Sequence, residues 1–69
     1  MEAIKISLAA ARVNAGLTQE EVAKRLKISN KTLINWEKGA AEPTFASLSM
    51  LSEIYGIPLD NIFLPSKSA

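Results

Sequence analysis

Residues Thr18 to Gly39 constrain the fold more than any other stretch of this 69-residue chain, because they encode two short helices joined by a tight turn. Thr18 and Glu21 form a capping-box pattern, in which the hydroxyl accepts an amide of the first helical turn and the carboxylate bonds back to the cap. Ser29 is a second N-cap signal. Gly39 suits the end of the second helix, because glycine tolerates a positive φ.

Apolar side chains give each of these two helices one buried side. Val22, Ala23 and Leu26 recur at helical spacing in the first, and Leu33 and Trp36 do so in the second. On a helical wheel, the opposite side of the second helix carries polar residues and one isoleucine, namely Asn30, Lys31, Ile34 and Asn35. We expect this side to remain uncovered.

The stretch TQEEVAKRLKISNKTLINWEKG resembles the helix-turn-helix of the Cro/cI-type phage-repressor family, the XRE-like regulators, with its L-T-Q-E-E-x-A, I-S-x-x-T-L and W-E-x-G runs in register. The resemblance covers Ser7 to Phe63. It implies an all-α, compact five-helix bundle that binds DNA. Lys27 stands where the family usually has glycine, so a non-glycine residue has to adopt a left-handed or nearly left-handed backbone, at a cost of about 1 kcal/mol.

Three further helices are predicted from caps, helical spacing and stop residues. Ser7 and Gly16 bound the first helix, Thr44 and Gly56 bound the fourth, and Pro58–Phe63 forms a short fifth whose apolar side chains close the core. No sheet is expected. A chain of this length holds one domain, here residues 1–69, with residues 1–6 as an extended N-terminal arm and 64–69 as a frayed tail.

Composition excludes several classes of function. The chain has no cysteine and no histidine, so it lacks disulfides, thiolate metal sites and the commonest general base. Its carboxylates form no pair at catalytic spacing, and we expect no enzyme activity, metal or cofactor. No apolar run is long enough to cross a membrane. The sequence has no basic region followed by a long apolar one, so we do not expect secretion. We expect a cytoplasmic, nucleoid-associated protein without a membrane partner or a small-molecule ligand.

Positive charge gathers on the stretch proposed to face DNA. The net charge is only +1, but Thr18–Gly39 holds five basic and three acidic side chains, whereas the remainder holds three basic and four acidic ones. This distribution favours a polyanionic partner for that stretch.

Base contacts are expected from the polar face of the second helix of the motif. Asn30 and Asn35 can bond the edge of adenine, Lys31 can donate to guanine, and Ile34 can lie against a thymine methyl. A merely solvated face is the alternative. Phosphate contacts are expected from the flanks, from the side chains of Thr32 and Lys38 and from the amides near Thr44. The resemblance implies a further phosphate contact by Gln19, which matches the family glutamine that contacts the DNA backbone.

The family resemblance further implies a structural ion pair between Arg12 and Glu37; a direct DNA contact by Arg12 is the alternative. It also implies a homodimer, for which Leu59, Phe63 and Leu64, with Ile4 and Ile6 of the arm, are the available apolar residues unless they belong to the core.

The resulting hypothesis is a regulator that binds double-stranded DNA, a repressor of phage or mobile-element type acting as a dimer on a palindromic operator. A protein-interaction module of the same fold, an antitoxin and a restriction-modification controller remain alternatives.

Overall fold

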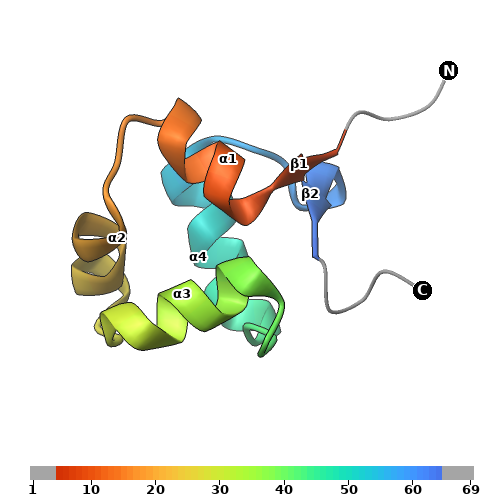
Figure 1. Ribbon diagram of the computed structural model, residues 1–69. Coiled ribbons are helices and arrows are strands. Elements are labelled where there is room, and N and C mark those ends of the chain that lie inside the picture. Colours follow the sequence, from red (N-terminus) through yellow and green to blue (C-terminus); the bar gives the residue numbers. More distant parts are fainter. Residues whose placement is uncertain (1–4, 65–69) are drawn as a thin grey trace, which may run out of the picture.

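A hydroxyl side chain caps the start of each of the four α-helices in the computed structural model, which describes residues 5–64. Ser7, Thr18, Ser29 and Thr44 each accept a hydrogen bond from the amide three residues later, at 3.1 Å. All four predicted caps are therefore confirmed. The elements in order are β1 (Ile6–Ser7), α1 (Leu8–Asn14), α2 (Gln19–Leu26), α3 (Asn30–Lys38), α4 (Phe45–Tyr55), the 3-10 turn η1 (Leu59–Asn61) and β2 (Ile62–Phe63) (Figure 1).

The turn between α2 and α3 is built on a lysine with left-handed backbone. Lys27 has φ 59° and ψ 43°, and it is the one non-glycine residue with positive φ among residues 5–64. This conformation lets the chain turn within three residues, from the end of α2 at Leu26 to the start of α3 at Asn30. The prediction for Lys27 is thus confirmed.

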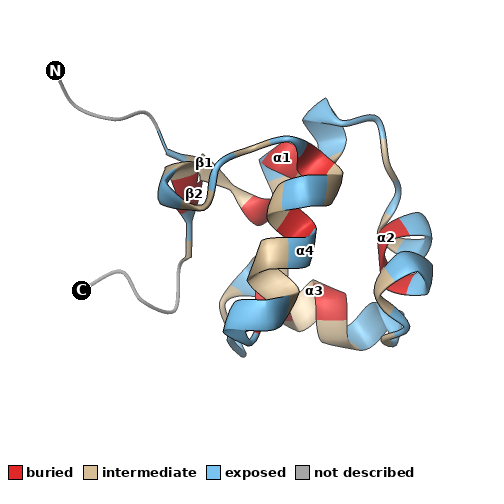
Figure 2. Ribbon diagram, turned by 180° about the vertical axis from the view of Figure 1, so that it is seen from behind, coloured by how far each residue is buried: buried red, intermediate tan, exposed pale blue. Residues whose placement is uncertain are grey.

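One hydrophobic core joins all four helices. Its buried members are Leu8, Ala11, Val22, Leu33, Trp36, Leu51, Tyr55 and Ile62. Figure 2 shows buried positions on the sides of the helices that face one another, while the outer sides of α2 and α3 are exposed or intermediate. The core therefore fixes α3 through one side and leaves its other side free.

The predicted fifth helix is wrong. The segment after α4 forms η1 and then β2, which pairs in parallel with β1 in the register Ile6↔Ile62 and Ser7↔Phe63. Pro58 has φ −58° and ψ 146°, so it is extended and, contrary to the prediction, is not the first residue of a helix. Six residues are also too few for a stable isolated helix, whereas pairing with β1 satisfies backbone groups of both segments. Residues 5–64 thus form four α-helices and a small strand pair.

Strand alternation separates the apolar residues of this last segment. Ile62 is 7% exposed and closes the core, whereas Phe63 on the opposite face is 38% exposed. The expectation that Phe63 closes the core is therefore wrong. Leu59, Leu64 and Ile6 pack against the core while partly buried. Ile4 and residues 65–69 lie outside the described residues.

The strand pair and α2 lie at opposite ends of the molecule in both ribbon views (Figures 1 and 2). Helix α3 occupies the lower edge in Figure 1, with α4 behind it. Within residues 5–64, no helix has the length and apolar character needed to cross a lipid bilayer.

Candidate nucleic-acid interface

Helix α3 is anchored by two buried side chains and presents a polar face. Leu33 is 0% and Trp36 8% exposed. Asn30 and Lys31 are exposed, while Ile34 and Asn35 are partly exposed. The four residues expected to contact bases therefore share the outer side of one helix. Ile34 is more covered than expected, because we anticipated an exposed position.

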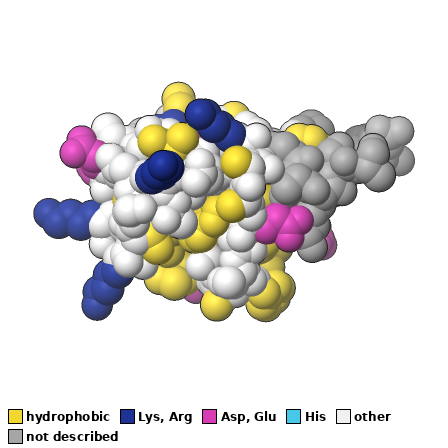
Figure 3. Space-filling model, turned by 60° about the horizontal axis from the view of Figure 1, so that its bottom comes forward, with side chains coloured by type: hydrophobic (Ala, Val, Ile, Leu, Met, Phe, Trp, Pro, Cys, Tyr) yellow, Lys and Arg dark blue, Asp and Glu magenta, His cyan; other side chains and the backbone are white. Residues whose placement is uncertain are grey.

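Basic side chains gather near the start of this helix. Figure 3 views the molecule from the side of α3, and dark-blue lysine and arginine side chains stand on the left and upper parts of the described surface. Lys24, Arg25, Lys27 and Lys31 are all exposed. A polyanion lying along α3 would meet this positive charge at the N-terminal end of the helix.

The residues expected to contact phosphates lie on the flanks of α3 and at the starts of α2 and α4. Lys38 and Thr44 are exposed, and Thr32 is partly exposed. The Thr32 hydroxyl lies 2.9 Å from the Ser29 hydroxyl, and the Thr44 hydroxyl is bonded to Ser47. Because both hydroxyls take part in capping, their side chains hold the helix starts in place.

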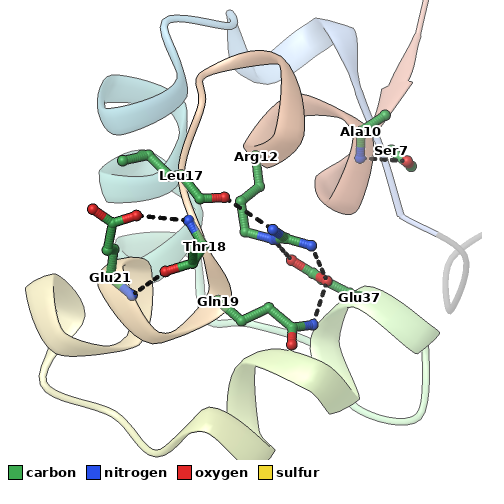
Figure 4. A network of polar contacts seen from close by, with 8 residues as sticks. All are labelled: Ser7, Ala10, Arg12, Leu17, Thr18, Gln19, Glu21 and Glu37. Atoms are coloured by element: carbon green, nitrogen blue, oxygen red, sulfur yellow. Dashed lines mark hydrogen bonds and ion pairs between the residues drawn. The ribbon is translucent and has the colours of Figure 1, made fainter.

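Gln19 belongs to a polar network that joins α1, α2 and α3 (Figure 4). Arg12 Nε lies 2.8 Å from Glu37 Oε2, forming an ion pair whose side chains are 15% and 7% exposed. Arg12 Nη1 donates to the Leu17 carbonyl at 2.9 Å. Gln19 Nε2 donates to Glu37 Oε1 at 3.0 Å. The Arg12 guanidinium is thus engaged inside the protein, which leaves little of it for a direct DNA contact.

Tyr55, the last residue of α4, is buried in the core. Burial, and secondarily the negative charge of Glu37, raises the pKa of its phenol to about 12. Its hydroxyl has no hydrogen-bond partner within the part of the chain that the structure describes. The phenol therefore stays neutral through the physiological range and adds no charge near the ion pair.

The start of α2 carries a complete capping box. Thr18 Oγ1 accepts the Glu21 amide at 3.1 Å, and Glu21 Oε1 accepts the Thr18 amide at 2.9 Å. The hydrogen bond from the Thr18 amide lowers the pKa of the Glu21 carboxyl below its ordinary value of 4.5. This box fixes the first turn of α2, the turn that contains Gln19.

Sequence reasoning missed the hydrogen bond from Gln19 to Glu37. The two residues lie 18 positions apart on different helices, so the contact depends on how α2 crosses α3. A partial signal was available, because Gln19 and Glu37 occupy the first turn of one helix and the last turn of the other. The exposure of Phe45, 75% at the first position of α4, was also missed.

Comparison with known proteins identifies the motif. A family model described as helix-turn-helix matches residues 8–62. The chain belongs to the helix-turn-helix family. This match confirms the resemblance to XRE-like regulators and covers α1 through the first residue of β2.

Three curated relatives of this helix-turn-helix protein are transcriptional regulators. An uncharacterized regulator of Methanocaldococcus jannaschii is 35% identical over 70% of this chain and 73% of its own length. The cryptic phage CTXphi transcriptional repressor RstR of Vibrio cholerae is 32% identical over 83% of this chain and 51% of its own. ImmR of Bacillus subtilis is 40% identical over 72% of this chain and 39% of its own. The chain thus spans about half of RstR and less of ImmR. No solved structure matches it significantly.

Proposed function

We propose that this helix-turn-helix protein is a sequence-specific double-stranded DNA-binding repressor, of phage or mobile-element type, that binds a palindromic operator as a dimer. The observation that carries the proposal is the uncovered polar face of α3, held in place by buried Leu33 and Trp36. A major groove is wide enough to admit such a helix. The similarity to a phage repressor supports repression as the direction of regulation.

Side-chain chemistry on α3 supports base reading. Exposed Asn30 can bond N6 and N7 of adenine, and exposed Lys31 can donate to O6 and N7 of guanine. Partly covered Ile34 can contact a thymine methyl, and Asn35 can read a further base edge. The flanking side chains of Gln19, Thr32 and Lys38, with the start of α4 at Thr44, would set the register through phosphates.

The dimer is proposed because one small module buries too little surface to select a site tightly. Phe63 is the candidate contact, since it is 38% exposed on the outer face of β2, while Leu59, Leu64 and Ile6 are packed against the core. The strand pair lies away from α2 (Figure 1), so a contact there leaves the basic end of each copy accessible to DNA. A repressor of this kind works on the nucleoid, in the cytoplasm.

Selection of preferred sites from a random pool of DNA duplexes tests the proposal. We expect an enriched sequence with two-fold symmetry and half-sites about one helical turn apart. Fluorescence anisotropy with that site should show tight binding that weakens steeply as salt increases, because phosphate contacts release counterions. An unchanged pool and no duplex binding at low salt would overturn the proposal and favour a protein-interaction module.

A further inference from the structure

The side chain of Lys27 takes no part in closing the turn that it occupies. The turn is closed by main-chain hydrogen bonds, because the Lys27 amide donates to the Lys24 carbonyl at 3.2 Å and the Ile28 amide donates to the Ala23 carbonyl at 3.0 Å. Glycine would make the same bonds and would adopt the φ of 59° without strain. Lys27 is exposed, and no residue among 5–64 holds its ammonium in a hydrogen bond or ion pair. The turn therefore requires neither the Cβ nor the charge at this position.

The acidic residues of α2 are not placed to offset the Lys27 charge. Glu20 precedes Lys24 by four positions, the spacing at which opposite charges attract each other along a helix. Glu21 precedes Arg25 by the same spacing. Lys27 has no acidic residue three or four positions away on either side. Of the three cations at this end of α2, Lys27 is thus the one whose charge is left for a partner outside the protein.

The turn lies at the outer end of the helix proposed to read DNA. Lys27 stands three residues before Asn30, the first residue of α3. In Figure 1, α3 runs from this turn toward the side of the molecule that carries the strand pair. The proposed dimer contact, Phe63, is on that strand pair, so the turn of each copy lies on the side away from the two-fold axis. A duplex that follows both α3 helices therefore reaches Lys27 at its outer flanks.

We propose that the Lys27 ammonium binds a DNA phosphate at the outer flank of each half-site, beyond the bases that α3 reads. The inference rests on the proposed DNA-binding function and adds a contact at a defined place on the duplex. Because phosphate contacts carry no base information, this contact needs the flank to be present and does not depend on the sequence of the flank. The strained lysine then exchanges some stability of the protein for affinity.

The first test compares Lys27→Ala with Lys24→Ala, which removes one positive charge from the same end of the molecule. Fluorescence anisotropy with the selected palindrome, over a series of salt concentrations, measures both variants. We expect Lys27→Ala to lose roughly fivefold in affinity per half-site at low salt, and its slope of log affinity against log salt to become shallower by about 0.9 per copy, because one counterion fewer is released. Lys24→Ala should change the slope much less. Equal changes in the two variants would overturn the inference and show only general attraction by charge.

The place of the contact is tested on the DNA. A methylphosphonate linkage, which replaces a phosphate by an uncharged group, is introduced at each flanking position in turn. At one outer position it should weaken binding of the parent as much as Lys27→Ala does, and it should cost Lys27→Ala no further affinity. A palindrome that ends at the half-sites should be bound equally by both proteins. If every flanking linkage weakened the parent and Lys27→Ala alike, Lys27 would not contact a phosphate there.

Lys27→Gly separates the effect of the side chain from that of the backbone. It removes the same ammonium as Lys27→Ala and relieves the left-handed strain, so we expect greater resistance to urea, followed by Trp36 fluorescence, together with the affinity loss of Lys27→Ala. Parent-like affinity of Lys27→Gly would contradict the contact. If the parent binds no duplex at low salt, the proposed function fails first. A parent that binds the palindrome while Lys27→Ala binds it equally well refutes this inference alone.

Discussion

At the scale of single residues, Lys27 shows how much local strain the motif tolerates. Its left-handed backbone, φ 59°, makes the turn between α2 and α3 without glycine. The left-handed conformation costs a residue with a Cβ about 1 to 2 kcal/mol, and glycine avoids this cost. Glycine, however, loses more backbone entropy on folding. The fold keeps the turn because buried Leu33 and Val22 on either side of it pack in the same core.

Lys27→Gly should therefore stabilise the protein by about 1 kcal/mol. Urea unfolding followed by Trp36 fluorescence measures the change in the free energy of unfolding. Lys27→Ala is the control, because it removes the same side chain and keeps the strained backbone, so it should not give this gain. Equal stabilities of the glycine and alanine variants would show that the turn is not strained.

Lys31 is the residue at which base reading is most directly tested. Lys31→Ala should reduce the discrimination between the selected site and a single-base variant by about 1 to 3 kcal/mol at one position of each half-site. Competition binding against a panel of single-base variants measures this difference. Lys24→Ala removes the same charge from an exposed position on α2 and should leave the base preference unchanged. If Lys31→Ala and Lys24→Ala showed the same base preference across the panel of single-base variants, base reading by Lys31 would be excluded.

At the scale of elements, caps decide where the helices begin. All four caps were predictable, because each depends on a hydroxyl residue and an amide three positions later in the chain. The end of the chain was not predictable in the same way. Pro58–Phe63 has helix-like spacing, but its conformation is decided by pairing with β1, a partner almost the whole chain away. The Gln19–Glu37 bond escaped prediction for the same reason.

The capping box of α2 should make stability depend on acidity. Because the Glu21 pKa is lowered below 4.5 in the folded state, its carboxylate contributes stability above about pH 4.5, and this contribution is lost as the pH falls through the folded pKa. Glu21→Ala should therefore be less stable than the parent at neutral pH, and the difference should shrink in acid. Thermal unfolding across a pH series measures this convergence, with Glu20→Ala as control. If the difference in stability between Glu21→Ala and the parent did not change with pH, the charge of the Glu21 carboxylate would contribute nothing to stability.

At the scale of the whole molecule, exposed Phe63 and the basic residues of α2 lie apart. Phe63 sits on the strand pair, at the end opposite α2 (Figure 1). The basic residues Lys24, Arg25 and Lys27 belong to α2 and the turn that follows it. This separation allows one end of the molecule to contact a second copy while the other contacts DNA.

Phe63→Ser should weaken self-association and operator binding together. Analytical ultracentrifugation should show a shift toward monomer, and the affinity for a full palindrome should fall while the affinity for an isolated half-site is retained. Val13→Ser is the matched control, because Val13 is an exposed apolar residue, 65% accessible, on α1. Unchanged association of the Phe63 variant would place the dimer contact elsewhere.

The parallel pairing of Ile6 with Ile62 has a consequence for synthesis on the ribosome. Strand β1 leaves the exit tunnel before β2, which is made after helices α1 to α4. Until then Ile62 is missing from the core, and the nascent helices carry an open hydrophobic seam. Ile62 therefore completes this core, so premature release of the chain before Ile62 would yield a product exposed to chaperones and proteases.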